Sequence, residues 1–350
     1  MAKRVVILGN SYAAYCQIPA LRWANAHGAP NDIVAICGKN LAKAHDTATR
    51  FGIPIATTSL DEALGARPDL IIVSTPVDLH AAMVERAITT TKAAILCEKP
   101  FTLRTDDARA LSRLARQEGR LALVDHQLRM SPPRRRLREL VRAGAVGSPW
   151  VARTEMCFGS VERLTRRASW WDEASRGGGV MQAVGSHLVD GLLWIFGPIV
   201  DVQARLTTCL RERAGVDGGA PVPVTADDHC ELWLTHASGV RATVVCTTVQ
   251  THGRRSLLEV IGSEGVVRLV DEDELTIARH GEAAVRVDVT LPSVADVDAC
   301  NDSAFARCEP LFLRALVRAL DGDAGALEGE ATFDDAVSCV EVLNAASMKR

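Results

Sequence analysis

The chain has 350 residues, of which 47% are hydrophobic and 24% charged, and its formal net charge is -3. A length above the roughly 100 to 200 residues of one domain predicts two domains, and this composition excludes a disordered, collagen-like or coiled-coil chain. The near-neutral charge gives no general attraction to nucleic acid or to an anionic membrane, so we expect a small-molecule partner.

Targeting and metal signals are missing from the sequence. No apolar run reaches the roughly 18 residues of a membrane span, and the first ten residues lead directly into a strand-like run. We therefore expect a cytoplasmic protein. The cysteines are scattered singly, without the spacing of a disulfide framework or a metal site, so we expect reduced thiols and no metal.

Residues 1–125 alternate strands with helices. Short apolar runs predict strands at 4–8, 33–37, 70–74, 93–97 and 121–125, with helices at 16–27, 41–51 and 79–89 and one more before the last strand. Continuous apolar strands spaced by helices are typical of a parallel sheet covered on both faces. We expect a doubly wound α/β domain that binds a dinucleotide.

Residues 126–350 follow a different pattern. Helices are predicted at 132–143, 186–195, 305–320 and 333–348, and strands at 150–157, 200–207, 230–235, 240–248, 256–261, 265–270 and 275–279. Hairpin-linked strands with alternating polarity indicate an α+β domain with a large, mostly antiparallel, open-faced sheet. The strands at 230–235 and 240–248 place apolar side chains such as Trp233 on the open face, so we expect a homodimer or homotetramer through it. The alternative for the last helix, 333–348, is that it packs back on the first domain.

The first turn between strand and helix reads Gly9-Asn10-Ser11-Tyr12-Ala13-Ala14, where dinucleotide folds have Gly-x-Gly-x-x-Gly/Ala. Ser11 departs from this pattern, because the second glycine normally keeps bulk away from the pyrophosphate. Backbone amides at the helix start bind phosphate, so we expect residues 9–13 to contact the cofactor. An ordinary structural turn is the alternative.

The second predicted strand ends in Cys37-Gly38-Lys39-Asn40, where NAD-selective folds carry an acid for the ribose hydroxyls. Lys39, with Lys43 one turn further, would attract a 2′-phosphate. The sequence favours NADP over NAD, and two ordinary surface lysines are the alternative.

Three further stretches carry candidate site residues: Ser74-Thr75-Pro76 with His80, Glu98-Lys99-Pro100, and the glycine-punctuated segment from Gly177 to Asp190. With Asp125-His126-Gln127-Leu128-Arg129, Thr225-Ala226-Asp227-Asp228 and the closing Ala331-Thr332-Phe333-Asp334-Asp335, they resemble the glucose-fructose oxidoreductase, inositol dehydrogenase and rhizopine-catabolism family, written Gfo/Idh/MocA. The likeness runs along the whole chain.

The resemblance implies a Rossmann domain that holds a nicotinamide cofactor and a second domain that frames a sugar or polyol pocket. The catalytic lysine and histidine of the family fall on Lys99 and His187. Ser74, Thr75, Pro76, His80, Glu98, Gln127 and Trp170, with Lys99 itself, complete the expected cofactor contacts. A hydride leaving a carbinol carbon needs a base at the hydroxyl, and a nearby cation stabilises the developing oxyanion.

Several of these roles stay open. Many family members have an aspartate where this chain has Ala183, which puts the sugar-type proton relay in question. Asp190 could orient His187 or face solvent, and Trp170 or Trp171 could lie beside the nicotinamide or pack in the core. Gln127 and Arg129 could contact the nicotinamide carboxamide or a substrate anion, and the alternative for Arg129 is a cation at the domain interface.

We thus expect an NAD(P)-dependent oxidoreductase acting on an alcohol or carbonyl carbon. Two alternatives remain, a cofactor-binding sensor without turnover and a redox-neutral glycoside enzyme that keeps its cofactor bound. Ser11 and Ala183 favour the sensor, because each removes something that cofactor binding or catalysis usually uses.

Overall fold

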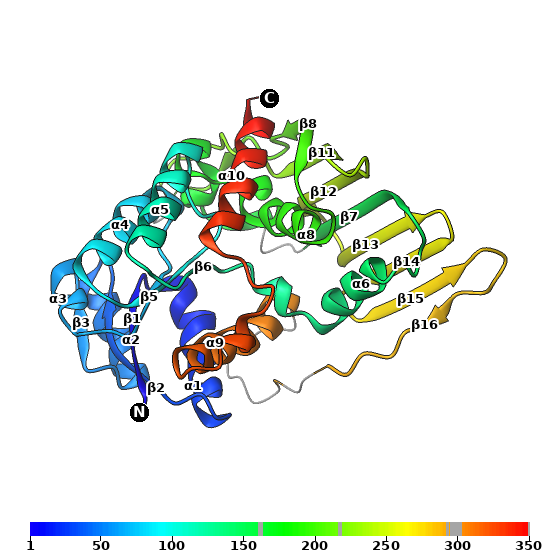
Figure 1. Ribbon diagram of the computed structural model, residues 1–350. Helices are drawn as coiled ribbons and strands as arrows, with labels where there is room; N and C mark the ends of the chain where they lie inside the picture. The colour runs from blue at the N-terminus through cyan, green and yellow to red at the C-terminus, as the bar shows by residue number, and fades with distance from the viewer. Residues whose placement is uncertain (160–163, 216–218, 292–293, 295–302, 349–350) are drawn as a thin grey trace. The chain divides into compact units, whose positions relative to one another are not determined.

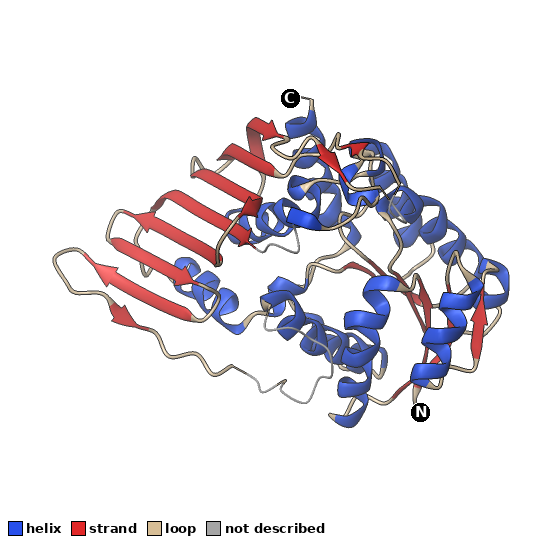
Figure 2. Ribbon diagram, turned by 180° about the vertical axis from the view of Figure 1, so that it is seen from behind, coloured by secondary structure: helices blue, strands red, loops and turns tan. Residues whose placement is uncertain are grey.

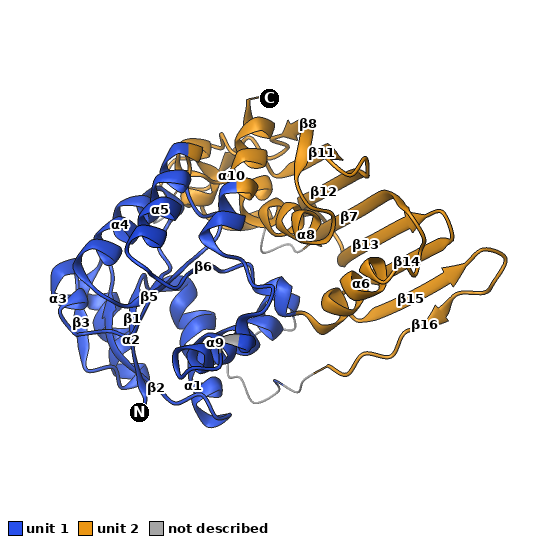
Figure 3. Cartoon of the chain, viewed as in Figure 1, with its two compact units in different colours: residues 1–102, 106–130, 292–337 blue, residues 103–105, 131–291, 338–350 orange. Residues whose placement is uncertain are grey.

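A computed structural model describes residues 1–159, 164–215, 219–291, 294 and 303–348. The chain forms two compact units (Figure 3). Unit 1 comprises Met1–Thr102, Asp106–Met130 and Pro292–Val337, and unit 2 comprises Leu103–Thr105, Ser131–Leu291 and Ser338–Arg350. The predicted division after residue 125 differs from these units mainly in the segment 292–337.

A six-stranded parallel sheet with the order β3-β2-β1-β4-β5-β6 forms the centre of unit 1 (Figure 1). Its strands are β1 (Lys3–Leu8), β2 (Asn31–Cys37), β3 (Ile55–Thr57), β4 (Leu70–Val73), β5 (Ala94–Cys97) and β6 (Ala122–Val124). Every residue of β4 and β5 is buried, which explains their continuous apolar sequence. The predicted doubly wound sheet is confirmed. Its order reverses between β1 and β4, where such sheets bind ligands beyond the carboxyl ends of their strands.

Helices flank this sheet, and α9 (Ala304–Leu320) packs on α1 (Ile18–Ala26). The other helices of this unit are α2 (Leu41–Phe51), α3 (Leu60–Leu64), α4 (His80–Thr90) and α5 (Thr105–Gln117), with short π or 3₁₀ turns at Ala13–Gln17, Val77–Leu79, Gln127–Met130 and Ala324–Leu327. The last helix, α10 (Phe333–Ser347), begins in unit 1 and ends in unit 2. Helix α9 packs against α1 and the turn Gln127–Met130, which explains why its segment belongs to unit 1.

Unit 2 is built on an eight-stranded sheet with the order β16-β15-β14-β13-β7-β12-β11-β8. Its strands are β7 (Pro149–Gly159), β8 (Ile199–Thr207), β11 (His229–His236), β12 (Arg241–Gln250), β13 (Arg254–Gly262), β14 (Gly265–Val270), β15 (Glu274–Arg279) and β16 (Val285–Arg286). The pair β7 and β12 is parallel, and the other neighbouring pairs are antiparallel, as predicted. A separate pair, β9 (Glu212–Arg213) and β10 (Val222–Pro223), is also antiparallel.

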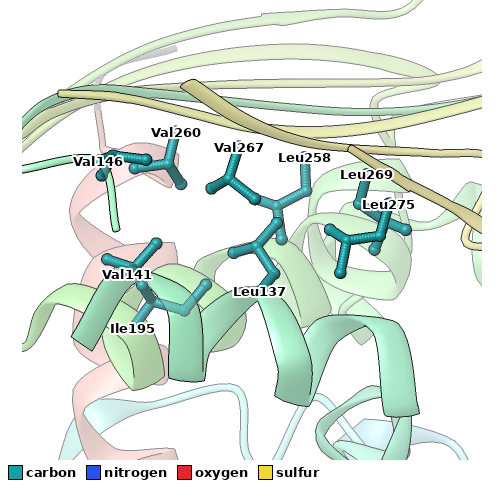
Figure 4. Close-up of a cluster of buried hydrophobic side chains, with 9 residues drawn as sticks. All are labelled: Leu137, Val141, Val146, Ile195, Leu258, Val260, Val267, Leu269 and Leu275. Carbon is teal, nitrogen blue, oxygen red and sulfur yellow. The ribbon is translucent and has the colours of Figure 1, made fainter. Parts of the chain in front are cut away.

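The helices of unit 2 are α6 (Pro132–Arg142) and α8 (Ser186–Phe196), with shorter turns at Trp170–Asp172, Ala174–Arg176 and Met181–Gly185. Helices lie on one face of the large sheet (Figure 2). Leu137 and Val141 of α6 and Ile195 of α8 are buried against Val146 and the strand residues Leu258, Val260, Val267, Leu269 and Leu275 (Figure 4). Burying each such side chain contributes roughly 1.5 to 3 kcal/mol, so this cluster fixes α6 and α8 on the sheet.

One helical stretch, Ala174–Phe196, is long and apolar enough to cross a membrane, but 72% of its most apolar window is buried inside the protein. A core helix of a folded domain gives the same signature. Of the described cysteines, Cys157 is half-buried, Cys209 is exposed and the others are buried thiols.

Candidate active site

The turns that follow β1 and β4 touch at the carboxyl edge of the parallel sheet. Gly9 has a φ of +123°, and a Cβ added to it would lie 2.1 Å from the carbonyl oxygen of Ser74. Only glycine fits this turn. A Cβ on Gly38, after β2, would lie 3.2 Å from the Asn10 side chain. The structure thus brings together Gly9, Asn10, Gly38 and Ser74, which were all predicted to bind the cofactor.

Two buried polar atoms at this edge, Asn10 Oδ1 and Ser74 Oγ, have no hydrogen-bond partner among the described residues. Such atoms mark a place where a polar ligand is expected. The helix begins at Ser11, whose side chain is exposed, and the first backbone N–H groups of a helix attract phosphate. These residues fit a dinucleotide, with its phosphates at the helix start.

The start of α2 carries positive charge. Asn40 caps this helix, because its Oδ1 accepts a hydrogen bond from the Lys43 backbone N–H at 3.0 Å. Lys39 and Lys43 are both exposed. A cation therefore stands where NAD-selective folds place an acid.

His80 joins the turn after β4 to the turn after β5. Its Nε2 lies 2.8 Å from the Thr75 carbonyl oxygen, and its Nδ1 lies 3.1 Å from that of Pro100. Burial lowers the pKa of His80, although the carbonyl groups and Asp78 act in the opposite direction. His80 thus links the backbone of Thr75, after β4, to the backbone of Pro100, after β5.

Lys99 is the second residue after β5 and is half-buried. Its backbone N–H lies 3.2 Å from Oε2 of Glu98, a buried residue. Burial lowers the pKa of the Lys99 ammonium, whereas the charges of Glu98, Asp125 and Glu309 raise it. Lys99 therefore lies at the carboxyl edge of the sheet and feels the charges of three carboxyl groups, those of Glu98, Asp125 and Glu309.

Gln127 and Arg129, which follow β6, have different hydrogen-bond partners. Gln127 Nε2 donates to the Tyr12 hydroxyl at 3.2 Å and to Glu309 Oε2 at 3.1 Å. Arg129 is buried; its Nη1 donates to the Gly329 carbonyl oxygen at 3.1 Å, and its Nη2 lies 3.7 Å from Asp335 Oδ1. Both partners belong to unit 1, and a contact of Arg129 with a substrate anion remains a prediction.

No site role was assigned from the sequence to three buried residues of unit 1. Gln17, Asp125 and Glu309 are each 0% exposed, and all three lie with Glu98 and Gln127 in one network. Glu309 carried a usable signal, since it is a lone acid in the apolar stretch Cys308 to Leu313. Lone buried acids are rare unless they are paired or functional.

In unit 2, His187 is the second residue of α8 and is 2% exposed. A π turn at Met181–Gly185 leads into this helix, and Asp227 holds the start of that turn. Asp227 Oδ2 accepts from the Met181 N–H at 2.8 Å, and the Asp227 carbonyl oxygen accepts from the Val180 N–H at 2.8 Å. The Thr225–Asp228 motif thus sets where the His187 helix begins.

The glycines before α8 are required by close packing. A Cβ on Gly178 would lie 2.4 Å from the Trp171 carbonyl oxygen, and one on Gly179, which has a φ of +110°, would lie 2.4 Å from Asp227 Oδ1. Trp170 and Trp171 form an edge-to-face pair with ring centroids 6.0 Å apart, and both are partly exposed. They are therefore not enclosed in a core.

A carboxylate between two arginines fixes the tryptophan turn. Arg166 Nη2 lies 2.6 Å and Arg213 Nε 3.0 Å from Asp172 Oδ1. Asp172 is buried; although burial acts to raise its pKa, hydrogen bonds from Arg166 and Ser169 and the charges of both arginines bring the pKa below its ordinary value.

The remaining predicted residues of unit 2 are also buried. Ala183 is 6% and Asp190 is 2% exposed, so the surface position considered for Asp190 is wrong. Lys99 belongs to unit 1 and His187 to unit 2, and their pairing remains a prediction.

Two family descriptions match this chain. Residues 3–126 match the oxidoreductase family with an NAD-binding Rossmann fold, and residues 134–268 match the GFO/IDH/MocA C-terminal domain. An uncharacterized oxidoreductase of Synechocystis is 31% identical over 280 residues, which are 79% of this chain and 74% of the relative. D-apiose dehydrogenase of Paraburkholderia graminis is 26% identical over 280 residues, 77% of this chain and 68% of the relative.

Solved structures share the fold along the whole chain. Levoglucosan dehydrogenase in complex with NADH and L-sorbose superposes with a TM-score of 0.84 at 20% identity, covering 100% of this chain and 97% of that one. An NAD binding oxidoreductase from Klebsiella pneumoniae gives a TM-score of 0.83 at 20% identity, covering 99% and 96%. Together with the matched domains and the glycine turn of the parallel sheet, these similarities identify the chain as a nicotinamide-dependent oxidoreductase of the Gfo/Idh/MocA family.

Proposed function

We propose that this chain transfers a hydride between a nicotinamide cofactor and an alcohol or carbonyl carbon of a sugar, polyol or related small molecule. The observation that carries the proposal is the carboxyl edge of the parallel sheet. There, Gly9 lets the turn after β1 approach Ser74 and Gly38 lets the turn after β2 approach Asn10, Asn10 and Ser74 offer buried polar atoms, and Lys99 lies just beyond the end of β5.

The residues of unit 1 would hold the cofactor in three parts. The helix start at residues 11–13 would bind the phosphates, Gly38 and Lys39 would lie at the adenine ribose, and Ser74 to Pro76 would contact the rest of the dinucleotide. When bound, the nicotinamide supplies or accepts the hydride.

Lys99 and His187 would serve the substrate oxygen. The Lys99 ammonium would donate a hydrogen bond to this oxygen and stabilise negative charge that develops on it. His187 would take up or return the hydroxyl proton, because imidazole titrates near neutral pH. With Ala183 in place of the carboxylate common in the family, the histidine would carry this proton without an aspartate four residues before it.

The substrate class is inferred from relatives. Two curated relatives bear the names D-apiose dehydrogenase and levoglucosan dehydrogenase, the latter 26% identical over 294 residues. Those names concern carbohydrates, which supports a polyhydroxylated substrate here. We further propose a preference for NADP, because the exposed Lys39 replaces an acid at the ribose end.

A fluorescence titration with NADH and NADPH, followed by a screen of sugars, polyols, dihydrodiols and imines for the absorbance of the reduced nicotinamide, tests the proposal. We expect micromolar or tighter binding of one cofactor and turnover of at least one polyhydroxylated compound. Binding without turnover of any compound would favour a sensor, and glycoside cleavage without net absorbance change would favour redox-neutral chemistry.

We also propose that the open face of the large sheet mediates self-association. Trp233 of β11 is 45% exposed on this face, between Gln203 of β8 and Thr243 of β12. Exposed aromatic surface on a sheet is usually covered in an oligomer. Sedimentation at micromolar concentration is expected to show a dimer or tetramer, and Trp233→Ser is expected to weaken it; a monomer throughout would contradict the proposal.

A further inference from the structure

Two carboxyl groups behind Lys99 share one amide. Gln17 Nε2 donates to Glu98 Oε1 at 2.9 Å and to Asp125 Oδ2 at 3.3 Å. Glu98 follows β5, Asp125 follows β6, and Gln17 ends the π turn before α1. Three elements of unit 1 therefore converge on one buried point.

A third carboxyl extends this cluster. Glu309 of α9 accepts a hydrogen bond from Gln127 Nε2 at 3.1 Å, and its side chain also hydrogen bonds to Asp125. Asp125 in turn hydrogen bonds to Glu98. The three acids thus form a chain, Glu98 to Asp125 to Glu309, in which Gln17 bridges the first two and Gln127 binds the third.

This chain of acids has to contain protons. Ionised carboxylates only accept hydrogen bonds, so a hydrogen bond between two carboxyl groups requires a proton on one of them. Two such contacts link the three acids, and each acid is at most 7% exposed. Like charges so close together in a dry interior cannot all be ionised. The three groups therefore titrate as one unit with shared protons.

Among the described residues, the titratable groups that interact with this unit include Lys99 itself, the Tyr12 hydroxyl and the Cys97 thiol. Cys16 acts on Tyr12, and the buried His126 directly follows Asp125 in the chain. Burial, with the nearby carboxyl groups, raises the pKa of Tyr12 and of Cys97, so both stay neutral at physiological pH. Lys99 is then the cation that faces the carboxyl unit, whose charges act on it.

Stability alone does not explain this arrangement. Burial and neighbouring acids raise the pKa of Glu98 and Asp125, so at neutral pH these groups oppose folding rather than favour it. Apolar residues of similar size would avoid that cost. Buried ionisable groups retained beside a reactive side chain are typical of functional sites.

We propose that Glu98, Asp125 and Glu309 form one proton-sharing unit that sets the charge state of Lys99 and so positions it for the reaction. The three acids are positioning residues, because they act through Lys99 and not on the substrate. The inference rests on the proposed function only for its catalytic consequence; the coupling of the acids to Lys99 is a property of the protein without substrate.

Chemical labelling of Lys99 tests the coupling directly. Trace acetylation across a pH series, followed by peptide mass spectrometry, gives the pH at which Lys99 becomes half reactive, because only the neutral amine reacts. The exposed Lys39 serves as internal standard. The cluster of the wild type can release further protons as the pH rises, and each negative charge stabilises the ammonium. Glu309→Gln removes one of these carboxyls, so its Lys99 midpoint is expected to fall by about one pH unit.

Two further variants make the outcome specific. Glu309→Asp restores a carboxyl and is expected to return the midpoint most of the way. Glu330→Gln replaces another carboxyl of unit 1 that is 4% exposed and is expected to leave the midpoint unchanged. If Glu309→Gln does not fold, Asp125→Asn takes its place, with the same expected direction.

Failure of this inference differs from failure of the proposed function. A midpoint equal to that of the wild type in a folded Glu309→Gln or Asp125→Asn protein would overturn the coupling, whatever the activity. A shifted Lys99 midpoint in Glu309→Gln would support the coupling. If Lys99→Met nevertheless keeps full turnover, the catalytic role of Lys99 is overturned while the coupling stands.

Discussion

The two units bury the same chemical group in opposite surroundings. In unit 1, Asp125 lies among other carboxyl groups, and burial raises its pKa well above the ordinary value. In unit 2, Asp172 lies between Arg166 and Arg213, and its pKa is below the ordinary value because their hydrogen bonds and charges outweigh burial. Asp125 therefore keeps its proton at pH values at which Asp172 is already ionised.

The difference separates two tasks. A carboxylate held by two arginines stabilises a turn, and its charge is fully compensated. A carboxyl among carboxyls weakens the fold at neutral pH and carries charge that responds to its neighbours. Unit 1 thus sets the reactivity of Lys99 electrostatically, whereas unit 2 sets the position of its histidine through backbone contacts, namely those of Asp227 and the glycines Gly178 and Gly179.

Removing the two side chains proposed to act on the substrate oxygen, those of Lys99 and His187, should have the largest effect. Lys99→Met and His187→Ala are each expected to lower kcat by about 10²- to 10⁴-fold, the range for a positioned acid, base or charge. Cofactor affinity, followed by nicotinamide fluorescence, is expected to change much less. Lys92→Met and His45→Ala, at exposed positions, are the matched controls. A loss of less than about threefold in His187→Ala would place the proton transfer elsewhere.

Asp172→Asn tests the carboxylate of unit 2. The substitution leaves Arg213, which is buried, facing a neutral amide, so the free energy of unfolding at pH 7 is expected to fall by about 3 to 5 kcal/mol. Urea titration followed by tryptophan fluorescence measures this. Glu173→Gln, at the exposed neighbouring position, is expected to cost less than about 1 kcal/mol.

The pH dependence of Asp172→Asn has a definite sign. Folded Asp172 binds its proton less readily than the unfolded chain, so its contribution is present above the ordinary carboxyl pKa near 4 and is lost as the pH falls below it. The difference between wild type and variant should therefore shrink on acidification toward pH 3. A difference that stays constant would mean that the charge of Asp172 is not what holds the turn.

Much of the fold could be predicted because its signals are local. The predicted helix at 41–51 matches α2, which begins after the cap Asn40 and ends at Gly52 in the left-handed conformation. The elements that were missed are short: β3 has 3 residues and β16 has 2, too few to show a periodic pattern. The placement of α9 in unit 1 depends on tertiary packing that no local pattern carries.

The site divides in the same way. Gly9 and Lys99 lie one and two residues after strands and were identified by their place in the sequence, whereas the carboxyl cluster depends on long-range contacts. Gln17 meets Glu98 across 81 residues and Asp125 across 108, and Gln127 meets Glu309 across 182. No spacing rule connects residues so far apart, so this part of the site required the structure.

Asp125→Asn tests the buried carboxyl group of unit 1. Folded Asp125 keeps its proton at pH values where the unfolded chain has released it, so its stabilising contribution is complete below pH 4 and declines as the pH rises. Each such group can change the free energy of unfolding by up to about 1.4 kcal/mol per pH unit. Between pH 5 and 8 the variant is therefore expected to lose less stability than the wild type, as measured by urea titrations at several pH values. A steeper decline in the variant would contradict the shared protons.

The smallest effect is expected at Lys39, the exposed counterpart of these buried charges. An exposed ionic contact contributes about 0.2 to 1 kcal/mol, so Lys39→Gln should weaken NADPH binding by at most about fivefold and leave NADH binding unchanged. Salt should shrink the wild-type preference for NADPH, because solvent screens an exposed charge, whereas Lys99 labelling should respond little to salt because its carboxyl partners are buried. Fluorescence titrations of both cofactors at low and high salt measure the first difference. If wild type binds NADH more tightly than NADPH at low salt, Lys39 does not select the cofactor. The turn after β2 then contributes only Gly38, which allows the Asn10 side chain to approach the backbone closely.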